Sequence, residues 1–178
     1  DIKAKAQSAE IAIFDEIGAW GVTAKQFIGD LKAHTGKSIV LSINSPGGSV
    51  FDALAIYNAL RAHGSPITTK TMGVAASAAS MIFMAGDKRV MPANTFLMIH
   101  NPLTFAYGNA DELRDIADTR DKITASLVGI YAKSGKADDE IKELLDAETW
   151  LNADDALAGG FATEVEAEMK IAASFDLE

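Results

Sequence analysis

Short apolar runs and amphipathic stretches follow one another along the first part of the chain. Residues 10–14 and 38–43 are apolar runs rich in β-branched residues and bounded by turn residues, which predicts two short buried strands. Between them, Thr23 and Gln26 form a capping box that starts a helix, and Gly36 ends it. A strand, a helix and a strand within about 35 residues form a βαβ unit, which predicts parallel strands and an α/β fold.

A second amphipathic helix is predicted over residues 49–62. Ser49 is its N-cap, Asp52 stands three residues on, and Gly64 closes the helix. The positions expected to face inward are Val50, Leu54, Tyr57 and Leu60.

The turn before this helix holds two adjacent glycines, Gly47 and Gly48. Such a pair allows backbone conformations that point N–H groups into a cleft. The turn is therefore compatible with an oxyanion-binding turn, with a tight turn that has no ligand, or with a phosphate loop. The spacing Gly-x-x-x-x-Gly-Lys-Ser/Thr of a phosphate loop is missing.

The segment 72–86 is apolar and full of small residues, and it follows a β-prone run at 67–71. We expect a strand, a sharp turn at Gly73, and a buried helix whose first turn holds Ser77. Free N–H groups at a helix start stabilise negative charge that develops nearby, which favours Ser77 as a nucleophile. The alternative is that Ser77 is an ordinary N-cap.

Residues 88–91 and 96–100 are predicted to form two short strands on either side of a turn at 92–94. His100 stands at the end of the second strand, where a side chain can project into a site. His34 and His63 lie at predicted helix C-termini, where the helix dipole accounts for them. His100 is therefore the histidine expected to carry chemistry.

A long helix is predicted from Asn109, its N-cap, to about Ser134. Its apolar seam is narrow and is interrupted by Arg120, so the helix either projects towards another subunit or lies solvated across its own core. Further predicted elements are a helix at 138–145, a short helix from Asn152 to 159–160, and a last strand at 161–165.

The composition bounds what such a chain can do. With 178 residues, 48% hydrophobic and 23% charged, we expect one globular domain over residues 1–178. A net charge of −9 without a basic cluster argues against a nucleic-acid surface. No segment is long and apolar enough to predict a membrane span, the absence of cysteine fits the cytoplasm, and no motif predicts a cofactor or a metal.

Four motifs stand in the order and approximate spacing of the ClpP family of serine peptidases, which the chain resembles over nearly its whole length. Other stretches are most similar to the phage and prophage branch, the ClpP-like head-maturation proteases. The four motifs are Ser42-Ile-Asn-Ser-Pro-Gly-Gly48, Gly73-Val-Ala-Ala-Ser77, Met98-Ile-His100-Asn-Pro102 and Thr149-Trp-Leu-Asn-Ala-Asp-Asp-Ala156. The phage-like stretches are Phe14-Asp-Glu-Ile-Gly-Ala-Trp-Gly21, Phe51-Asp-Ala-Leu-Ala-Ile-Tyr-Asn58 and Asp146-Ala-Glu-Thr-Trp150.

This resemblance implies a ClpP/crotonase-type spiral of βαβ units with a projecting handle helix, and a Ser-His-acid triad. Ser77 matches the family's nucleophile and His100 its general base. Backbone N–H groups of Gly48 and Ala78 match the oxyanion hole. The family usually has an aspartate where Glu148 stands here, so Glu148 is the expected acid and Asp146 the second choice.

The resemblance further implies a serine endopeptidase that works on polypeptides inside a homo-oligomeric ring, processing phage or prophage capsid or scaffold proteins in the host cytoplasm or the prohead. ATP-dependent members meet an AAA+ unfoldase through a longer N-terminal segment. Only residues 1–9 precede the first predicted strand here, which counts against such docking. The alternatives are an inactive structural ring subunit, a crotonase-like acyl-CoA enzyme, and a Ser-Lys peptidase with Lys70 or Lys88 as base.

Overall fold

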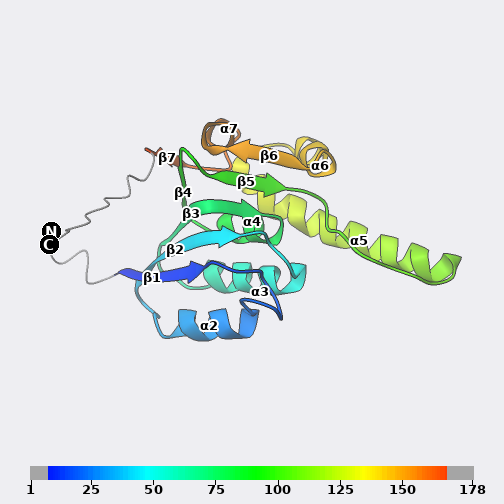
Figure 1. The fold of residues 1–178 in the computed structure, drawn as a ribbon, viewed down its shortest axis with the longest axis horizontal. Helices are drawn as coiled ribbons and strands as arrows, with labels where there is room; N and C mark the ends of the chain where they lie inside the picture. The colour runs from blue at the N-terminus through cyan, green and yellow to red at the C-terminus, as the bar shows by residue number, and fades with distance from the viewer. Residues whose placement is uncertain (1–7, 168–178) are drawn as a thin grey trace, which may run out of the picture.

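A mixed sheet with helices packed on it forms the body of the molecule (Figure 1). The computed structural model describes residues 8–167; residues 1–7 and 168–178, which the single-domain prediction includes, lie outside that range. The strands are β1 (Ser8–Ile13), β2 (Ser38–Ser45), β3 (Ile67–Ala76), β4 (Lys88–Pro92), β5 (Phe96–Ile99), β6 (Thr149–Asn152) and β7 (Glu164–Glu166). The helices are α2 (Ala24–Lys32), α3 (Val50–Arg61), α4 (Ala78–Phe83), α5 (Ala110–Tyr131), the 3₁₀ turn η1 (Ala132–Ser134), α6 (Asp138–Asp146) and α7 (Ala153–Ala158).

Parallel pairing dominates the sheet. The strand order is β1-β2-β3-β4-β7, with every neighbouring pair parallel, and β5 pairs in parallel with β3. β6 joins β5 and is antiparallel to it. The predicted βαβ unit and the α/β fold class are therefore confirmed. β6 is not among the predicted strands, because its four residues alternate only half-buried and exposed side chains.

β3 is the strand that organises the sheet, and it is longer than predicted. It continues as one strand through Gly73 to Ala76, with a shift of register against β2 between Thr71 and Ala75, so the predicted sharp turn at Gly73 is wrong. A Cβ at Gly73 would lie 2.6 Å from Oδ1 of Asn44, an oxygen that also accepts a hydrogen bond from the Val74 N–H at 3.2 Å. The glycine therefore makes room for the Asn44 side chain, and the chain turns only at Ser77.

Two successive strands share the edge of β3. Residues 68–70 of β3 pair with β4, and residues 74–76 pair with β5, both in parallel. β4 and β5 therefore run in the same direction, and the predicted turn between them does not reverse the chain.

The predicted helix starts are confirmed, whereas the predicted ends are less accurate. Thr23 accepts a hydrogen bond from the Gln26 N–H, and Ser49 accepts one from the Asp52 N–H. α2 ends at Lys32 and not at Gly36, because the following residues form a turn of their own.

The inward face of α3 differs in part from the prediction. Ala53, Ile56 and Leu60 are buried, whereas Val50, Leu54 and Tyr57 are half-buried and pack at the edge of the core. Small and branched side chains fit deepest, because α3 also lies close to α4.

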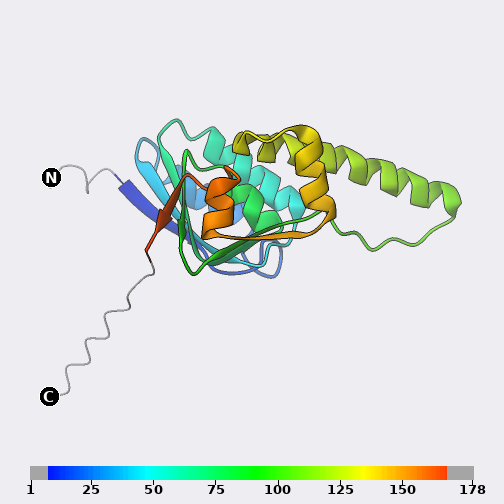
Figure 2. The same cartoon turned by 90° about the horizontal axis from the view of Figure 1, so that it is seen from above.

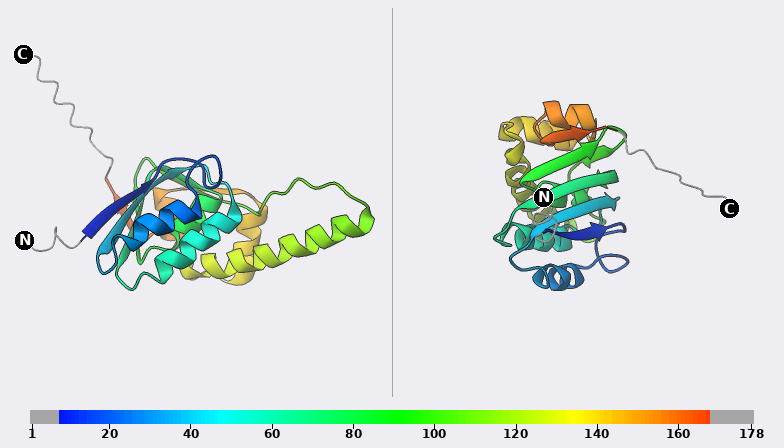
Figure 3. Two further views of the ribbon diagram at one scale, coloured as in Figure 1. Left: turned by 90° about the horizontal axis from the view of Figure 1, so that it is seen from below. Right: turned by 90° about the vertical axis from the view of Figure 1, so that its left-hand side faces the viewer.

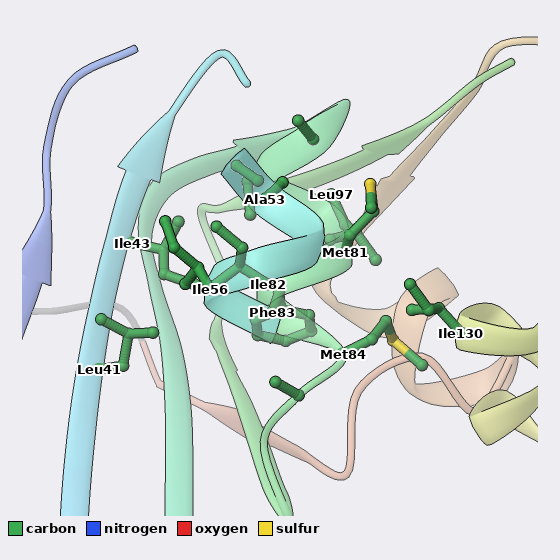
Figure 4. Close-up of a cluster of buried hydrophobic side chains, with 14 of the residues drawn as sticks. Leu41, Ile43, Ala53, Ile56, Met81, Ile82, Phe83, Met84, Leu97 and Ile130 are labelled. Carbon is green, nitrogen blue, oxygen red and sulfur yellow. The ribbon is translucent and has the colours of Figure 1, made fainter. Parts of the chain in front are cut away.

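The core lies between the sheet and the helices α3, α4 and α5 (Figure 4). All six residues of α4 are buried, as the sequence predicts, although the helix ends at Phe83, before Gly86. Figure 4 shows Ile82 and Phe83 of α4 beside Ile56 of α3 and next to the strand that carries Ile43. A short helix whose side chains are all buried can therefore pack firmly beneath the end of β3.

Helix α5 extends well beyond the body of the molecule, as Figures 2 and 3 show. Asn109 is the N-cap, as predicted, and forms a capping box with Glu112. The buried residues of α5 are confined to its last five positions, 127–131. The prediction of a projecting helix is confirmed. Within residues 8–167, no helix combines the length and the apolar character that crossing a membrane requires.

A buried arginine on β4 holds the last elements of the chain against the sheet. α6 and α7 lie where helices are predicted, and the last strand, β7, starts at Glu164, later than predicted. The Arg89 guanidinium on β4 donates to the carbonyl oxygens of Phe161 at 2.6 Å and Gly160 at 3.1 Å. It also donates to the Gly86 carbonyl at 3.3 Å, so one side chain ties α7 and β7 to the end of α4.

Replacing Arg89 by methionine is expected to destabilise the fold by about 3 kcal/mol, because buried carbonyl groups lose a charged donor. Urea unfolding followed by far-UV circular dichroism measures this. Arg114→Met, on the exposed part of α5, is the matched control and should change stability by less than about 0.5 kcal/mol. Equal stabilities of the two variants would contradict this role of Arg89.

Candidate active site

Ser77 and His100 meet at one edge of the sheet. Ser77 follows β3 and His100 follows β5, and the carboxyl ends of adjacent parallel strands lie side by side. The Ser77 hydroxyl oxygen is 2.7 Å from Nε2 of His100, a hydrogen-bond distance. The Ser77 N–H donates to the Met98 carbonyl at 2.9 Å, so the sheet itself fixes the spacing between the two side chains.

Ser77 adopts a backbone conformation that is rare for a residue with a side chain. Its φ is 54° and its ψ is −125°, and its hydroxyl makes no capping hydrogen bond to α4. The alternative of an ordinary N-cap is therefore wrong. A Cβ at Gly47 would lie 2.8 Å from Cβ of Ser77, so only a glycine allows this turn to approach so closely. Strained turns of this kind cluster at functional sites.

A second hydroxyl holds the Ser77 turn in place. The N–H and the side chain of Ser80 both donate to the Ser77 carbonyl, at 2.9 and 2.6 Å. The Ser80 oxygen lies 2.6 Å from the phenol oxygen of Tyr131, and burial raises the pKa of that phenol. The phenol therefore stays protonated and can donate to Ser80. This role of Ser80 is not predicted from the sequence, although its position three residues after Ser77 could have indicated it.

The two candidate acids have different neighbours. Oε2 of Glu148 lies 3.9 Å from Nδ1 of His100, which is an ion-pair distance but too long for a hydrogen bond. Glu148 has a φ of 49° and its side chain is 59% exposed. Oδ1 of Asp146 instead accepts a hydrogen bond from the Asn101 amide at 2.5 Å. Glu148 is thus the candidate that faces His100.

Asn101 is a site residue that sequence analysis missed. Its N–H donates to the Leu145 carbonyl at 3.2 Å and its amide donates to Asp146, so it fastens the end of α6 beside His100. Glu148 follows directly in the turn before β6. The sequence feature that could have identified Asn101 is its position immediately after His100.

The backbone N–H groups of Gly48 and Ala78 are free to donate hydrogen bonds to a ligand. Neither donates a hydrogen bond within residues 8–167, and both residues line the same cleft as Ser77 and His100. Ile17 bonds to the carbonyl of Gly47 and to the N–H of Ser49, both at 2.7 Å, and leaves the Gly48 N–H unused. Gly48 has a φ of 139°, and a Cβ there would collide with the Ile17 carbonyl oxygen. Glycine is therefore required at this position.

The cleft beside these groups has a volume of about 610 Å³, enough for several side chains of a peptide. Its walls are largely apolar and come from α3, α4, the segment after His100 and α5. They include Phe51, Met81, Leu103, Ile123, Leu127 and Tyr131.

The two lysines considered as alternative bases lie elsewhere. Lys70 forms an ion pair with Glu166, and Lys88 pairs with Glu164 at 2.6 Å. Lys70 stands on β3, seven residues before Ser77, which is about 23 Å at the usual rise per residue. Among residues 8–167, no group of three or more His, Asp or Glu side chains is placed to hold a metal ion.

Comparison with known proteins shows which family has a matching sequence. The family model described as Clp protease matches residues 8–169. This chain belongs to the Clp protease family. The family comprises serine-type peptidases, and the parallel sheet with its covering helices is the family's α/β fold.

Individual relatives of this Clp protease chain are named ATP-dependent Clp protease proteolytic subunits. One from Pleurastrum terricola is 35% identical over 135 residues, which cover 74% of this chain and 69% of the relative. One from Bacteroides fragilis is 36% identical over 133 residues, which cover 73% of this chain and 64% of the relative. A second Bacteroides fragilis strain gives the same identity over 60% of the relative. The chain thus spans roughly two thirds of the length of these relatives.

The different neighbours of the two acids lead to a prediction. Glu148→Gln is expected to lower kcat at least about tenfold, because the imidazolium formed on His100 loses its facing charge. Asp146→Asn keeps an oxygen that accepts from Asn101 and should cost less than about threefold. Hydrolysis of a fluorogenic peptide, with the oligomeric state checked by native mass spectrometry, measures both. A larger loss in Asp146→Asn would reverse the assignment.

The free N–H of Gly48 leads to a second prediction. Gly48→Ala forces this peptide unit away from Ile17 and is expected to lower kcat about 100-fold with little change in KM. Gly64→Ala is the matched control, since Gly64 also has a positive φ but has open space around its Cβ position. Near-normal kcat in folded Gly48→Ala would argue against a role of this N–H.

Proposed function

We propose that this chain is a serine endopeptidase in which Ser77, His100 and Glu148 form the triad and the N–H groups of Gly48 and Ala78 form the oxyanion hole. The observation that carries the proposal is the 2.7 Å contact between the Ser77 hydroxyl and Nε2 of His100. A serine hydroxyl becomes a useful nucleophile when a neighbouring imidazole takes its proton.

The first half of the reaction follows from these positions. Oγ of Ser77 attacks the carbonyl carbon of the scissile peptide while Nε2 of His100 takes the hydroxyl proton. The carbonyl oxygen becomes an oxyanion that accepts hydrogen bonds from the Gly48 and Ala78 N–H groups. The C–N bond then breaks, His100 passes its proton to the leaving amine, and an acyl ester remains on Ser77.

Water completes the cycle. His100 takes a proton from the water molecule, whose oxygen attacks the ester carbon, and the same N–H groups hold the new oxyanion. The bond to Oγ of Ser77 breaks and His100 returns the proton to that oxygen. In both halves Glu148 stabilises the imidazolium, and its 3.9 Å separation can shorten to a hydrogen bond when substrate fills the cleft.

A homo-oligomeric ring is part of the proposal. The segment that runs alongside the projecting part of α5 exposes large apolar side chains, which favours burial against another copy. These are Leu103, Phe105 and Tyr107, followed by Leu113 on α5 itself. The relatives are named proteolytic subunits, which agrees with a protein that works as one of several subunits.

Processing of phage or prophage capsid or scaffold proteins, in the host cytoplasm or the prohead, is the substrate proposal. Its support is the resemblance of residues 14–21, 51–58 and 146–150 to the head-maturation branch. The chain carries no nucleotide-binding motif, so any energy-dependent unfolding of substrates would be the work of a partner.

An inactive ring subunit is the second candidate. The observation that favours it is Glu148, which is exposed and not hydrogen bonded to His100. Assembly without reactivity of Ser77 is its signature.

Labelling with a fluorophosphonate probe, with peptide mapping of the modified residue, separates the two candidates. The wild type should be labelled at Ser77, Ser77→Ala not at all, and His100→Ala at least about 100-fold more slowly, because the base is gone. Ser126→Ala, an exposed serine on α5, should label normally. An unlabelled wild type that assembles fully would favour the inactive subunit.

A further inference from the structure

Arg120 lies in the face of α5 that lines the cleft beside Ser77. Ile116, Ile123 and Leu127 line the same cleft, and Arg120 occupies the place between them in a spacing of four, three and four residues. That spacing keeps all four side chains on one side of a helix. The residue that interrupts the apolar seam in the sequence therefore faces the candidate active site.

The Arg120 guanidinium has no carboxylate partner within 4.0 Å in the described part of the chain. The residues three and four positions away on α5 are Ile116, Ala117, Ile123 and Thr124, all uncharged, although the helix as a whole is rich in acids. Arg114 on the same helix is paired with Asp111 at 2.7 Å. The surroundings of Arg120 therefore leave its donors available.

Among residues 8–167, Arg120 is the one permanently charged side chain that lines the cleft. It also borders a second cavity of about 560 Å³, whose other charged lining residues are Asp121, Lys142 and Asp146. Asp146 accepts a hydrogen bond from Asn101 and forms no ion pair with the guanidinium within 4.0 Å. The chain carries a net charge of −9, and a local cation offsets the repulsion that an acidic peptide would otherwise meet.

We propose that Arg120 is a specificity-determining residue that binds an aspartate or glutamate side chain of the polypeptide substrate. The inference rests on the proposed peptidase function and names a feature of its substrate. A guanidinium offers two parallel N–H donors that match a carboxylate, whereas the apolar walls of the cleft accept the neighbouring side chains. Substrates are therefore apolar segments that contain an acidic residue at one fixed distance from the cleaved bond.

The test uses fluorogenic peptides that are identical except for Glu, Gln or Lys, placed in turn at each position around the cleaved bond. At one position the wild type should hydrolyse the Glu peptide with a kcat/KM about tenfold above that of the Gln peptide. In Arg120→Gln this ratio should fall to about one, and in Arg120→Glu the Lys peptide should become the best substrate. Arg114→Gln is the matched control and should keep the wild-type ratio.

Two further readouts separate charge recognition from a merely structural effect. The Glu/Gln ratio should decrease with added salt, because the ion pair is partly exposed. It should also stay constant over the pH range in which the substrate carboxylate is ionised, since arginine keeps its charge throughout. A loss of activity in Arg120→Gln that is equal for all three peptides would overturn the proposal.

A binding measurement keeps the test independent of turnover. Fluorescence anisotropy gives the Kd of the same labelled peptides for Ser77→Ala and for Ser77→Ala with Arg120→Gln. A preference for the Glu peptide that disappears in the double variant supports the role of Arg120, even if the wild type hydrolyses none of the peptides. In that case the failure belongs to the proposed hydrolysis. Equal Kd values for the Glu and Gln peptides in Ser77→Ala would overturn the proposal.

Discussion

The parallel pairing of β3 with β5 is the constraint on which the site depends. Ala76 of β3 stands opposite Met98 of β5, and the Ser77 N–H donates to the carbonyl of Met98. Because the two strands run in the same direction, the residues that follow them emerge at one edge of the sheet. The buried helix α4 packs beneath that edge and leaves the end of β3 little freedom to move. A 2.7 Å contact between two side chains distant in the sequence is thus built from backbone pairing.

Close approach of backbone segments completes the arrangement around Ser77. Gly47 lies against Ser77, and Gly48 lies against Ile17, with no space for a Cβ at either position. Ser80 and Tyr131 bind the Ser77 carbonyl from below through a short chain of hydrogen bonds. The strained conformation of Ser77 is therefore held from two sides. The N–H groups of Gly48 and Ala78, which line the cleft, donate to no other group within residues 8–167.

His100 and Glu148 differ in their exposure to solvent, which affects the ion pair between them. His100 is largely buried, whereas Glu148 is exposed and stands at ion-pair distance from it. Solvent screens an exposed pair, so the stabilisation of a charged imidazole depends on what covers this side of the molecule. Under the proposed function, a filled cleft or a neighbouring subunit would exclude water here and strengthen the interaction between Glu148 and His100.

The sequence alone determined the elements that depend on local signals. The caps at Thr23, Ser49 and Asn109 and the α/β class follow from residue type and spacing, and they are present in the structure. Ser77 and His100 could be selected from the sequence, because each stands at the end of a β-prone run and carries suitable chemistry.

The tertiary structure decided what depends on non-local contacts. Gly73 reads as a turn in the sequence, but its purpose is space for Asn44, a residue of the neighbouring strand. Which of Glu148 and Asp146 faces His100 depends on the hydrogen bond between Asn101 and Asp146, which joins residues 45 positions apart. The sequence shows Arg120 only as a break in an apolar seam, and the packing of α5 beside the cleft gives that break its place near Ser77. Spacing along the chain fixes helices and strands, whereas the neighbours of a side chain are fixed only when the elements pack together.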